Sequence, residues 1–184
     1  MKKTVFLLLV LLFAGVLKAQ NVEQYKKYHD KGRMLILEGK YEKAIGCLDS
    51  AIMIMPYYTT IFQDRGYAFM QLKKYDEAIA DFDHVLSRKP YMNEARLQRG
   101  MAFFHTNQLD LAEYDLRQVA ETNPRKSHEI AMYLNYIEEE KAIEEQELME
   151  YHLAVQQQAE MERIRRARHR EEVIWNTVIP LAFW

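Results

Sequence analysis

The sequence predicts an all-α protein built as a right-handed α-solenoid, in which helical hairpins stack side by side. Three observations lead to this fold class. Apolar residues recur at the helical period, as in the run Ala78, Ile79, Phe82, Val85 and Leu86. No segment alternates with the period of two that a half-buried strand requires. Finally, one helical phrase occurs three times at a spacing of 34 residues, which is typical of repeat architectures.

The repeated phrase reads GKYEKAIGCLDSAIMIMP, then KKYDEAIADFDHVLSRKP, then NQLDLAEYDLRQVAETNP. The aligned copies, with the residues that precede them, share a glycine, an alanine and a proline column: Gly32, Gly66 and Gly100; Ala44, Ala78 and Ala112; Pro56, Pro90 and Pro124. We expect two helices per unit, which cross closely where Gly66 faces Ala78. Gly39 and Asn107 lie at the turns and suit a left-handed helix cap. Proline then ends each second helix, because its ring cannot continue it.

This pattern resembles the tetratricopeptide repeat family, and the resemblance covers residues 25–124. It implies a repeat region over residues 22–126, with helix–turn–helix units at about 25–58, 59–92 and 93–126. One hairpin cannot bury both of its faces, whereas stacked hairpins form a superhelical strip with a concave surface. The alternative is an unrelated helical bundle with accidental periodicity, which three columns at one spacing disfavour.

In this family the concave groove comes from five positions of each first helix. Carried over to this sequence, the resemblance implies a peptide groove formed by Lys26, His29, Arg33, Ile36 and Leu37; Thr60, Gln63, Tyr67, Met70 and Gln71; Glu94, Leu97, Met101, Phe104 and His105. We expect this groove to be basic in the first repeat and apolar in the third, where Met101 and Phe104 would be adaptable anchors. Its expected ligand is a segment of another protein with an acidic end and an apolar anchor.

One subset of the family grips the C-terminal carboxylates of chaperones with five polar side chains. The corresponding positions hold His29, Arg33, Asp64, Glu94 and Gln98. Because Asp64 and Glu94 would repel a carboxylate, we do not expect that activity here.

The repeats are expected to end before Ser127. Residues 127–137 place Ile130 and Ile137 on packing positions, but the glycine and alanine columns beyond the third repeat hold Leu134 and Gln146. This segment therefore predicts a capping helix with no fourth hairpin behind it. Residues 138–172 lack glycine and proline and predict a charged helical extension. Two interpretations of it stay open, a solvated helix or a coiled-coil partner face, because its apolar positions fall short of sustained heptads.

The two ends of the chain carry further signals. Residues 1–19, MKKTVFLLLVLLFAGVLKA, have the layout of a secretory signal peptide, and their apolar run is short for a membrane span. They resemble Bacteroidetes-type export signals and predict a periplasmic or cell-envelope protein; an uncleaved anchor is the alternative. No cysteine follows the run to carry a lipid, and the single Cys47 excludes an internal disulfide.

At the other end, residues 163–170 hold five arginines and precede an apolar tail, residues 173–184. This arrangement predicts either weak contact with an anionic membrane surface or a tail that docks on the preceding helix. Nucleic-acid binding is not expected, because glutamates flank the arginines and the net charge of -2 becomes more negative once the leader is removed.

The sequence contains no catalytic, cofactor or metal-binding motif of the HExxH, CxxC, GxSxG or phosphate-loop type. Its histidines are scattered: His29, His84, His105, His128, His152 and His169. We therefore predict a non-enzymatic adaptor that holds another protein in the cell envelope. The alternative is a structural component that acts through its C-terminal helix and tail, on a membrane surface or on a copy of itself.

Overall fold

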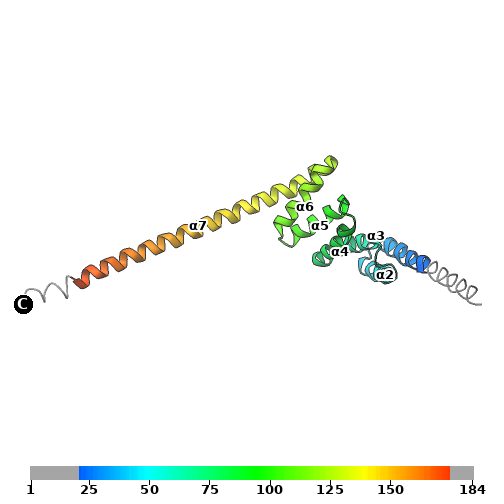
Figure 1. Cartoon of the computed structure of the whole chain (residues 1–184), viewed down its shortest axis with the longest axis horizontal. Coiled ribbons are helices and arrows are strands. Elements are labelled where there is room, and N and C mark those ends of the chain that lie inside the picture. The colour runs from blue at the N-terminus through cyan, green and yellow to red at the C-terminus, as the bar shows by residue number, and fades with distance from the viewer. Residues whose placement is uncertain (1–20, 175–184) are drawn as a thin grey trace, which may run out of the picture. The chain divides into compact units, whose positions relative to one another are not determined.

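The computed structural model describes residues 21–174, which form helices and contain no strand (Figure 1). The chain divides into two compact units, Met1–Ile137 and Glu138–Trp184. The predicted signal peptide and all but the first two residues of the apolar tail lie outside the described residues. No helix in the described part is long and apolar enough to cross a membrane.

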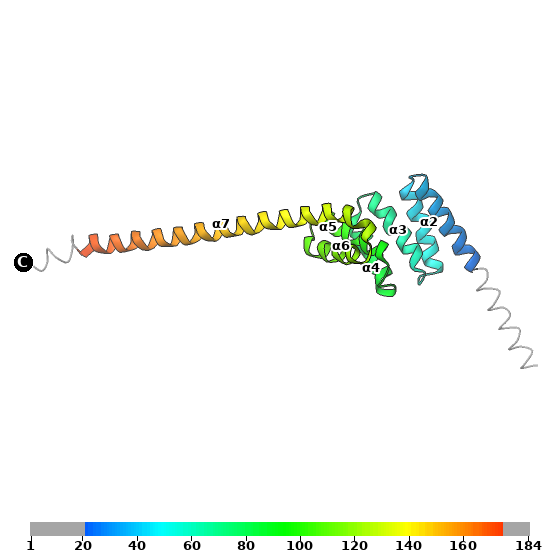
Figure 2. The same ribbon diagram turned by 90° about the horizontal axis from the view of Figure 1, so that it is seen from above.

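The first unit contains three helical hairpins in chain order. The helix over residues 21–37 pairs with α2 (Tyr41–Ile54), α3 (Thr59–Gln71) pairs with α4 (Tyr75–Arg88), and α5 (Asn93–His105) pairs with α6 (Leu109–Thr122). Figure 2 shows the pairs following one another along this unit. The hairpins confirm the predicted all-α solenoid of helix–turn–helix repeats, which a long helix follows.

A residue with positive φ closes the turn within each hairpin: Gly39 at 71°, Lys73 at 58° and Asn107 at 58°. The left-handed cap predicted at Gly39 and Asn107 is therefore confirmed. Lys73 occupies the same place in the second hairpin, although its Cβ makes this conformation less favourable than it is for glycine.

The glycine column repeated within the sequence allows close packing against a bulky side chain. A Cβ added to Gly66 would lie 2.9 Å from Cε1 of Phe82 and 3.3 Å from Cβ of Asp81. The equivalent Cβ on Gly32 would meet Leu48 at 2.8 Å. The Cβ added to Gly32 also lies 3.5 Å from the backbone oxygen of Ala44, the residue equivalent to Ala78, so the glycine and alanine columns meet in the first hairpin as expected. At Gly66 the nearest atoms belong to Phe82 and Asp81. The large residue one turn after each alanine fills the space that glycine leaves, while the alanines are fully buried in the same cores.

The core of the first unit runs through all three hairpins. Three apolar clusters surround Leu48, Phe82 and Leu116. Ile52 packs against the first two clusters, and Ile79 packs against the last two, so neighbouring hairpins share side chains. This continuity is what a stack of hairpins needs, because no single hairpin buries both of its faces.

After α6 the chain makes a short 3₁₀ turn, η1 (Pro124–Lys126), and enters the long helix α7 (Ser127–Val173). Within the first unit, residues 127–137 of α7 bury Ile130 and Ile137 against Leu97, Leu116 and neighbouring side chains. The part of α7 in the second unit differs in character, since every residue from position 142 onward is exposed.

Candidate peptide groove

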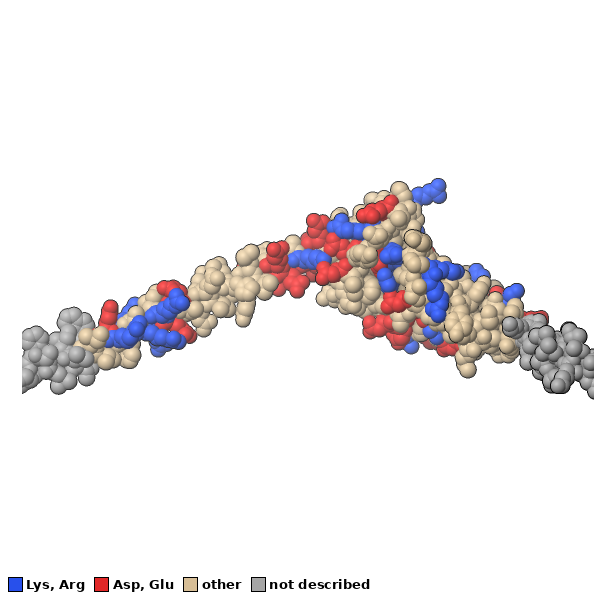
Figure 3. Space-filling view, viewed as in Figure 1, with Lys and Arg blue, Asp and Glu red and all other residues tan. Residues whose placement is uncertain are grey.

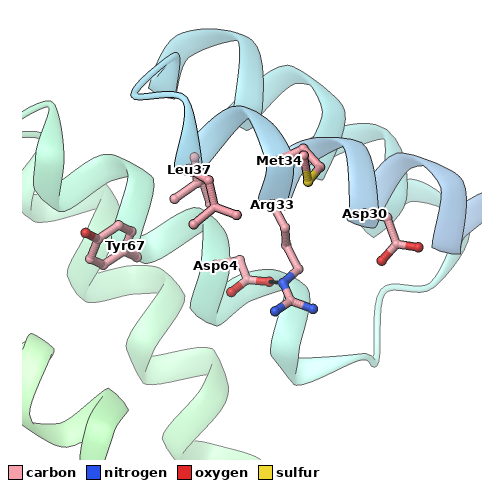
Figure 4. Close-up of a pocket in the computed structure, with 7 residues that line it drawn as sticks. Asp30, Arg33, Met34, Leu37, Asp64 and Tyr67 are labelled. Carbon is pink, nitrogen blue, oxygen red and sulfur yellow. Dashed lines mark ion pairs between the residues drawn. The ribbon is translucent and has the colours of Figure 1, made fainter.

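An open cavity of about 480 Å³ lies between the helix of residues 21–37 and α3 (Figure 4). It is lined by Asp30, Arg33, Met34, Ile36, Leu37, Asp64 and Tyr67. Four of these residues were predicted as groove positions: Arg33, Ile36, Leu37 and Tyr67. Asp30 and Met34 were missed, although they fall three residues before and one residue after Arg33 on an exposed helix.

Asp64 controls the charge of this cavity. Its Oδ2 atom lies 2.6 Å from Nε2 of the buried His29 and 3.8 Å from Nε of Arg33. Figure 4 shows the guanidinium of Arg33 directed toward the carboxylate of Asp64, with Asp30 farther along the same helix. The expectation of a basic groove in the first repeat is therefore wrong at this point, because two carboxylates accompany the arginine. Arg33 nevertheless keeps 63% of its side chain exposed.

The apolar part of the cavity is unusually open. Leu37 is 81% exposed, Met34 is 57% exposed, and Tyr67 is 39% exposed. The three side chains come from two neighbouring hairpins and line one cavity. A long aliphatic side chain, a flexible thioether and an aromatic ring can adapt their shapes to an apolar ligand group.

Two of the predicted groove residues belong to the core instead. Met70 packs with Phe82 and Val85, and Leu97, which is 2% exposed, packs with Leu116. Predicting them as groove residues was wrong because both lie on the side of their helix that faces the second helices. Of the remaining predicted positions, His29 is buried, Thr60, Gln63, Met101 and Phe104 are half-buried, and Lys26, Gln71, Glu94 and His105 are exposed.

The third repeat does not offer the open apolar anchor that was expected of it. The ring of Phe104 lies 5.2 Å from that of Tyr133 and 5.3 Å from that of Tyr136, both on the first turns of α7. Nearby, Nζ of Lys126 pairs with Glu94 at 2.7 Å. Phe104 is thus a packing residue beneath residues 127–137, the capping segment, and the open apolar part of the predicted groove lies in the first two repeats.

The arrangement of the described side chains also bears on whether they could bind a metal ion or act as a nucleophile. Within residues 21–174, no group of three or more histidine, cysteine, aspartate or glutamate side chains is arranged to hold a metal ion. Cys47 is a half-buried helix residue. The cavity groups described above are suited to binding and positioning a ligand through apolar contact and charge.

The second hairpin matches a known family. Residues 59–91 match the sequence model of the tetratricopeptide repeat. No curated protein is significantly similar to the chain.

Solved structures of tetratricopeptide domains resemble the repeat region. The first such domain of Spaghetti (RPAP3), bound to the HSP90 peptide SRMEEVD, is 27% identical with a TM-score of 0.61; the match covers 65% of this chain and 94% of that one. The second domain of human RPAP3, bound to the HSP70 peptide SGPTIEEVD, is 25% identical with a TM-score of 0.58, covering 64% and 98%. The Yersinia enterocolitica secretion chaperone SycD, bound to a peptide of the translocator YopD, shares the fold at 18% identity and a TM-score of 0.59, covering 65% and 95%. These findings support the predicted resemblance.

Proposed function

We propose that this protein is an exported, non-enzymatic adaptor that binds a peptide segment of a partner protein in the cavity between residues 21–37 and α3. The observation that carries the proposal is the exposed apolar group of Met34, Leu37 and Tyr67 beside the exposed guanidinium of Arg33. Exposed apolar side chains gathered around one cavity mark a binding site more often than scattered ones do. The peptide complexes of the two RPAP3 domains support a binding function of this kind.

The ligand that fits this cavity has one large apolar residue next to one acidic residue. The apolar group contacts Met34, Leu37 and Tyr67, and the acid pairs with Arg33. His29 forms a hydrogen bond with Asp64 and Arg33 offsets its charge, so a single acid beside Arg33 is tolerated. A run of acidic residues, as in the EEVD end of the peptides bound to RPAP3, would also meet Asp30 and is disfavoured.

The export part of the proposal rests on the leader-like residues 1–19. It is tested separately, by fractionating cells that express the full chain and sequencing the N-terminus of the envelope form. A mature N-terminus at Gln20 is the expected result. If the protein is instead recovered from the soluble cytoplasm with residues 1–19 intact, the proposal of export is wrong, and the binding proposal is unaffected.

The binding proposal is tested with a random peptide library selected on the purified protein, followed by titration calorimetry of the tightest peptides. Leu37→Asp places a charge in the apolar part of the cavity and should weaken these peptides at least about tenfold, a loss of about 1.4 kcal/mol. Met53→Asp is the matched control, because Met53 on α2 is 84% exposed and does not line the cavity.

Both variants should keep their helical circular dichroism, since neither side chain is buried. Arg33→Glu should weaken acidic peptides, and the difference from the unmodified protein should shrink at high salt. Equal affinity of Leu37→Asp and Met53→Asp for every selected peptide would show that this cavity is not the binding site.

A further inference from the structure

One face of α7 in the second unit carries mainly small, apolar and amide side chains at helical spacing, interrupted by Glu150 and Glu160. Its uncharged members are Ala142, Gln146, Met149, Leu153, Gln157, Met161 and Ile164, hereafter the methionine face. Its larger side chains are exposed, with Met149 at 65%, Leu153 at 54%, Met161 at 66% and Ile164 at 45%. Successive members are three or four residues apart, so they follow one side of a helix. The spacing lacks a strict seven-residue repeat, which is why the sequence shows no sustained heptads.

The charges that flank this face are segregated along the helix. Glutamates dominate its first part and arginines its last part, with a mostly uncharged stretch between them (Figure 3). Arg163 follows Glu145 by 18 residues, and Arg165 follows Glu147 by the same number. Since 18 residues make about five helical turns, each arginine lies on the same flank as its glutamate. One flank therefore carries Glu145 and Arg163, and the other carries Glu147 and Arg165.

Two surface hollows include residues of this face and of its flanks. The first is lined by Ala142, Glu145, Gln146, Met149 and Glu150, and the second by Gln158, Met161, Glu162, Ile164, Arg165 and Arg168. They lie at about equal distances on either side of residue 155. Two glutamates border the first hollow, and two arginines and Glu162 border the second, so the net charges of the two hollows are opposite in sign.

We propose that two copies of this protein associate through the methionine face, with their α7 helices antiparallel and centred near residue 155. Residues equally far before and after this centre are then level with each other. Met149 of one copy lies beside Met161 of the other, and Gln146 lies beside Ile164. An antiparallel two-fold arrangement keeps each flank on its own side, so Glu145 approaches Arg163 of the second copy and Glu147 approaches Arg165. Because the proposed dimer has two-fold symmetry, each of these contacts occurs twice.

Charge decides between the two possible directions. In a parallel, in-register pair, Glu145 and Glu147 would lie beside the same glutamates of the second copy, and the arginines beside arginines. Like charges at this spacing are destabilising, whereas the antiparallel pair places opposite charges together on both flanks. Arg163 already lies 3.7 Å from Glu160 of its own helix, but its side chain is 82% exposed and its guanidinium has donors for a second carboxylate. Glu150 and Glu160 are level in this arrangement, which favours a reversible dimer over a permanent one.

This inference concerns the second unit and is independent of the peptide groove. It is tested by sedimentation velocity on the full chain over a range of concentrations. E145R/E147R and R163E/R165E each place like charges on both flanks and should weaken self-association at least about tenfold. An equimolar mixture of the two variants should form the heterodimer. One chain carrying all four substitutions should again form a homodimer, because every pair is reversed but still opposite in sign.

A matched pair of single variants separates position from net charge: Glu145→Arg should weaken self-association, and the control Glu144→Arg changes the net charge by the same amount. Glu144 is nine residues before Leu153, so the control position lies on the opposite side of the helix and lines neither hollow. The control variant should dimerise like the unmodified chain. Circular dichroism must show equal helix content throughout. The proposal is overturned if E145R/E147R still dimerises normally, or if the fourfold variant stays monomeric with its helices intact.

Discussion

Arg65 holds the carboxylate of Asp81 with two parallel hydrogen bonds, in which Nε donates to Oδ2 at 2.8 Å and Nη2 donates to Oδ1 at 2.6 Å. Its third nitrogen, Nη1, donates to Asp49 at 2.6 Å. Arg65 lies on α3, so it ties its own second helix, α4, to the second helix of the preceding repeat, α2. Hydrogen bonding to Asp81 also raises the pKa of Arg65, which keeps this arginine charged.

The same arrangement recurs one repeat later. Arg99 donates through Nε and Nη2 to Asp115 at 2.7 Å and 2.8 Å, and through Nη1 to Asp83 at 2.6 Å. Asp115 is 1% exposed, so its charge depends on Arg99 and on Arg96, whose Nη1 donates to Oδ1 at 3.4 Å, for compensation. Arg65 and Arg99 therefore form a ladder of charged hydrogen bonds between successive hairpins.

Removing an arginine from this ladder should be far more costly than removing an exposed one. Arg65→Met leaves the carboxylate of Asp81, which is 3% exposed, without its bidentate partner and should lower the free energy of unfolding by about 3–5 kcal/mol. Arg117→Met is the control, since Arg117 pairs with Glu113 one turn away, is 56% exposed, and should lose at most about 1 kcal/mol. Urea denaturation measures both. Similar losses would show that the ladder does not hold the hairpins together.

The glycine column gives a second contrast between two positions. Gly66→Ala adds a Cβ 2.9 Å from the ring of Phe82, and a ring wedged between helices can move little, so overpacking should cost about 1–3 kcal/mol. Gly46→Ala adds a Cβ with nothing within 4 Å in the middle of α2 and should stabilise the protein by about 0.5–1 kcal/mol. The measurement is the denaturation midpoint of each variant. If the two substitutions shift it in the same direction, the packing described for Gly66 is incorrect.

The fold was predictable because its determinants are local and repeated. Small residues at crossings, positive-φ turns and terminal prolines recur with each hairpin, so three copies confirm one another. The ladder recurs at the same spacing of 34 residues, through Arg65 and Arg99. From sequence alone, however, a charged residue on a helix is interpreted as a solvent-exposed side chain until its partner is known. Its aspartates come from two different hairpins, which no single helical pattern reveals.

The groove was predictable only in part, for a related reason. The groove positions of the tetratricopeptide family identify which helix faces the concave side. They correctly predicted that Arg33 and Tyr67 line one cavity. They do not determine how deeply each side chain is buried, which depends on the size of its neighbours. Leu97 became a core residue because Leu116 and Ile130 surround it. Asp64 of the second hairpin lines the cavity and pairs with His29 of the first hairpin, a contact between hairpins that the sequence pattern does not show.

His84 should make stability depend on pH. Its ring stacks on Phe62 with centroids 3.7 Å apart, and Nη1 of Arg88 lies 2.9 Å from its Nε2. Burial, followed by the charge of Arg88, lowers the pKa of His84, although nearby Asp81 opposes this. The folded state therefore disfavours the protonated ring.

The unfolded chain binds that proton more readily, so stability contributed by neutral His84 is present above pH ~6.5 and is lost as the pH falls below it. Urea denaturation at pH 7.5 and at pH 5.5 should show lower stability at the acidic value. His84→Asn should reduce the difference, while the other histidines keep their own contributions. An unchanged difference in the variant would exclude His84 as its source.

Tyr67 and Phe104 were both predicted as groove residues, and the structure separates them. Tyr67 is 39% exposed in the cavity, so Tyr67→Ala should leave the free energy of unfolding within about 0.5 kcal/mol of the unmodified protein. It should weaken selected peptides by at least about 1 kcal/mol, because aromatic side chains dominate such contacts. Phe104 packs against Tyr133 and Tyr136, so Phe104→Ala should destabilise the fold by at least about 1 kcal/mol.

The two variants should therefore lose different properties: Tyr67→Ala loses peptide affinity, and Phe104→Ala loses stability. Phe104→Ala, titrated at a temperature where it remains folded, should bind the selected peptides with nearly normal affinity, because its ring lies beneath the capping segment and does not line the cavity. Phe104→Leu should recover much of the lost stability, since a large apolar group again fills the space under Tyr133. If Phe104→Ala abolishes binding without lowering the denaturation midpoint, the third repeat is an open anchor after all. The accessible groove would then extend beyond the first two hairpins, and the capping segment would have to leave Phe104 when a peptide binds.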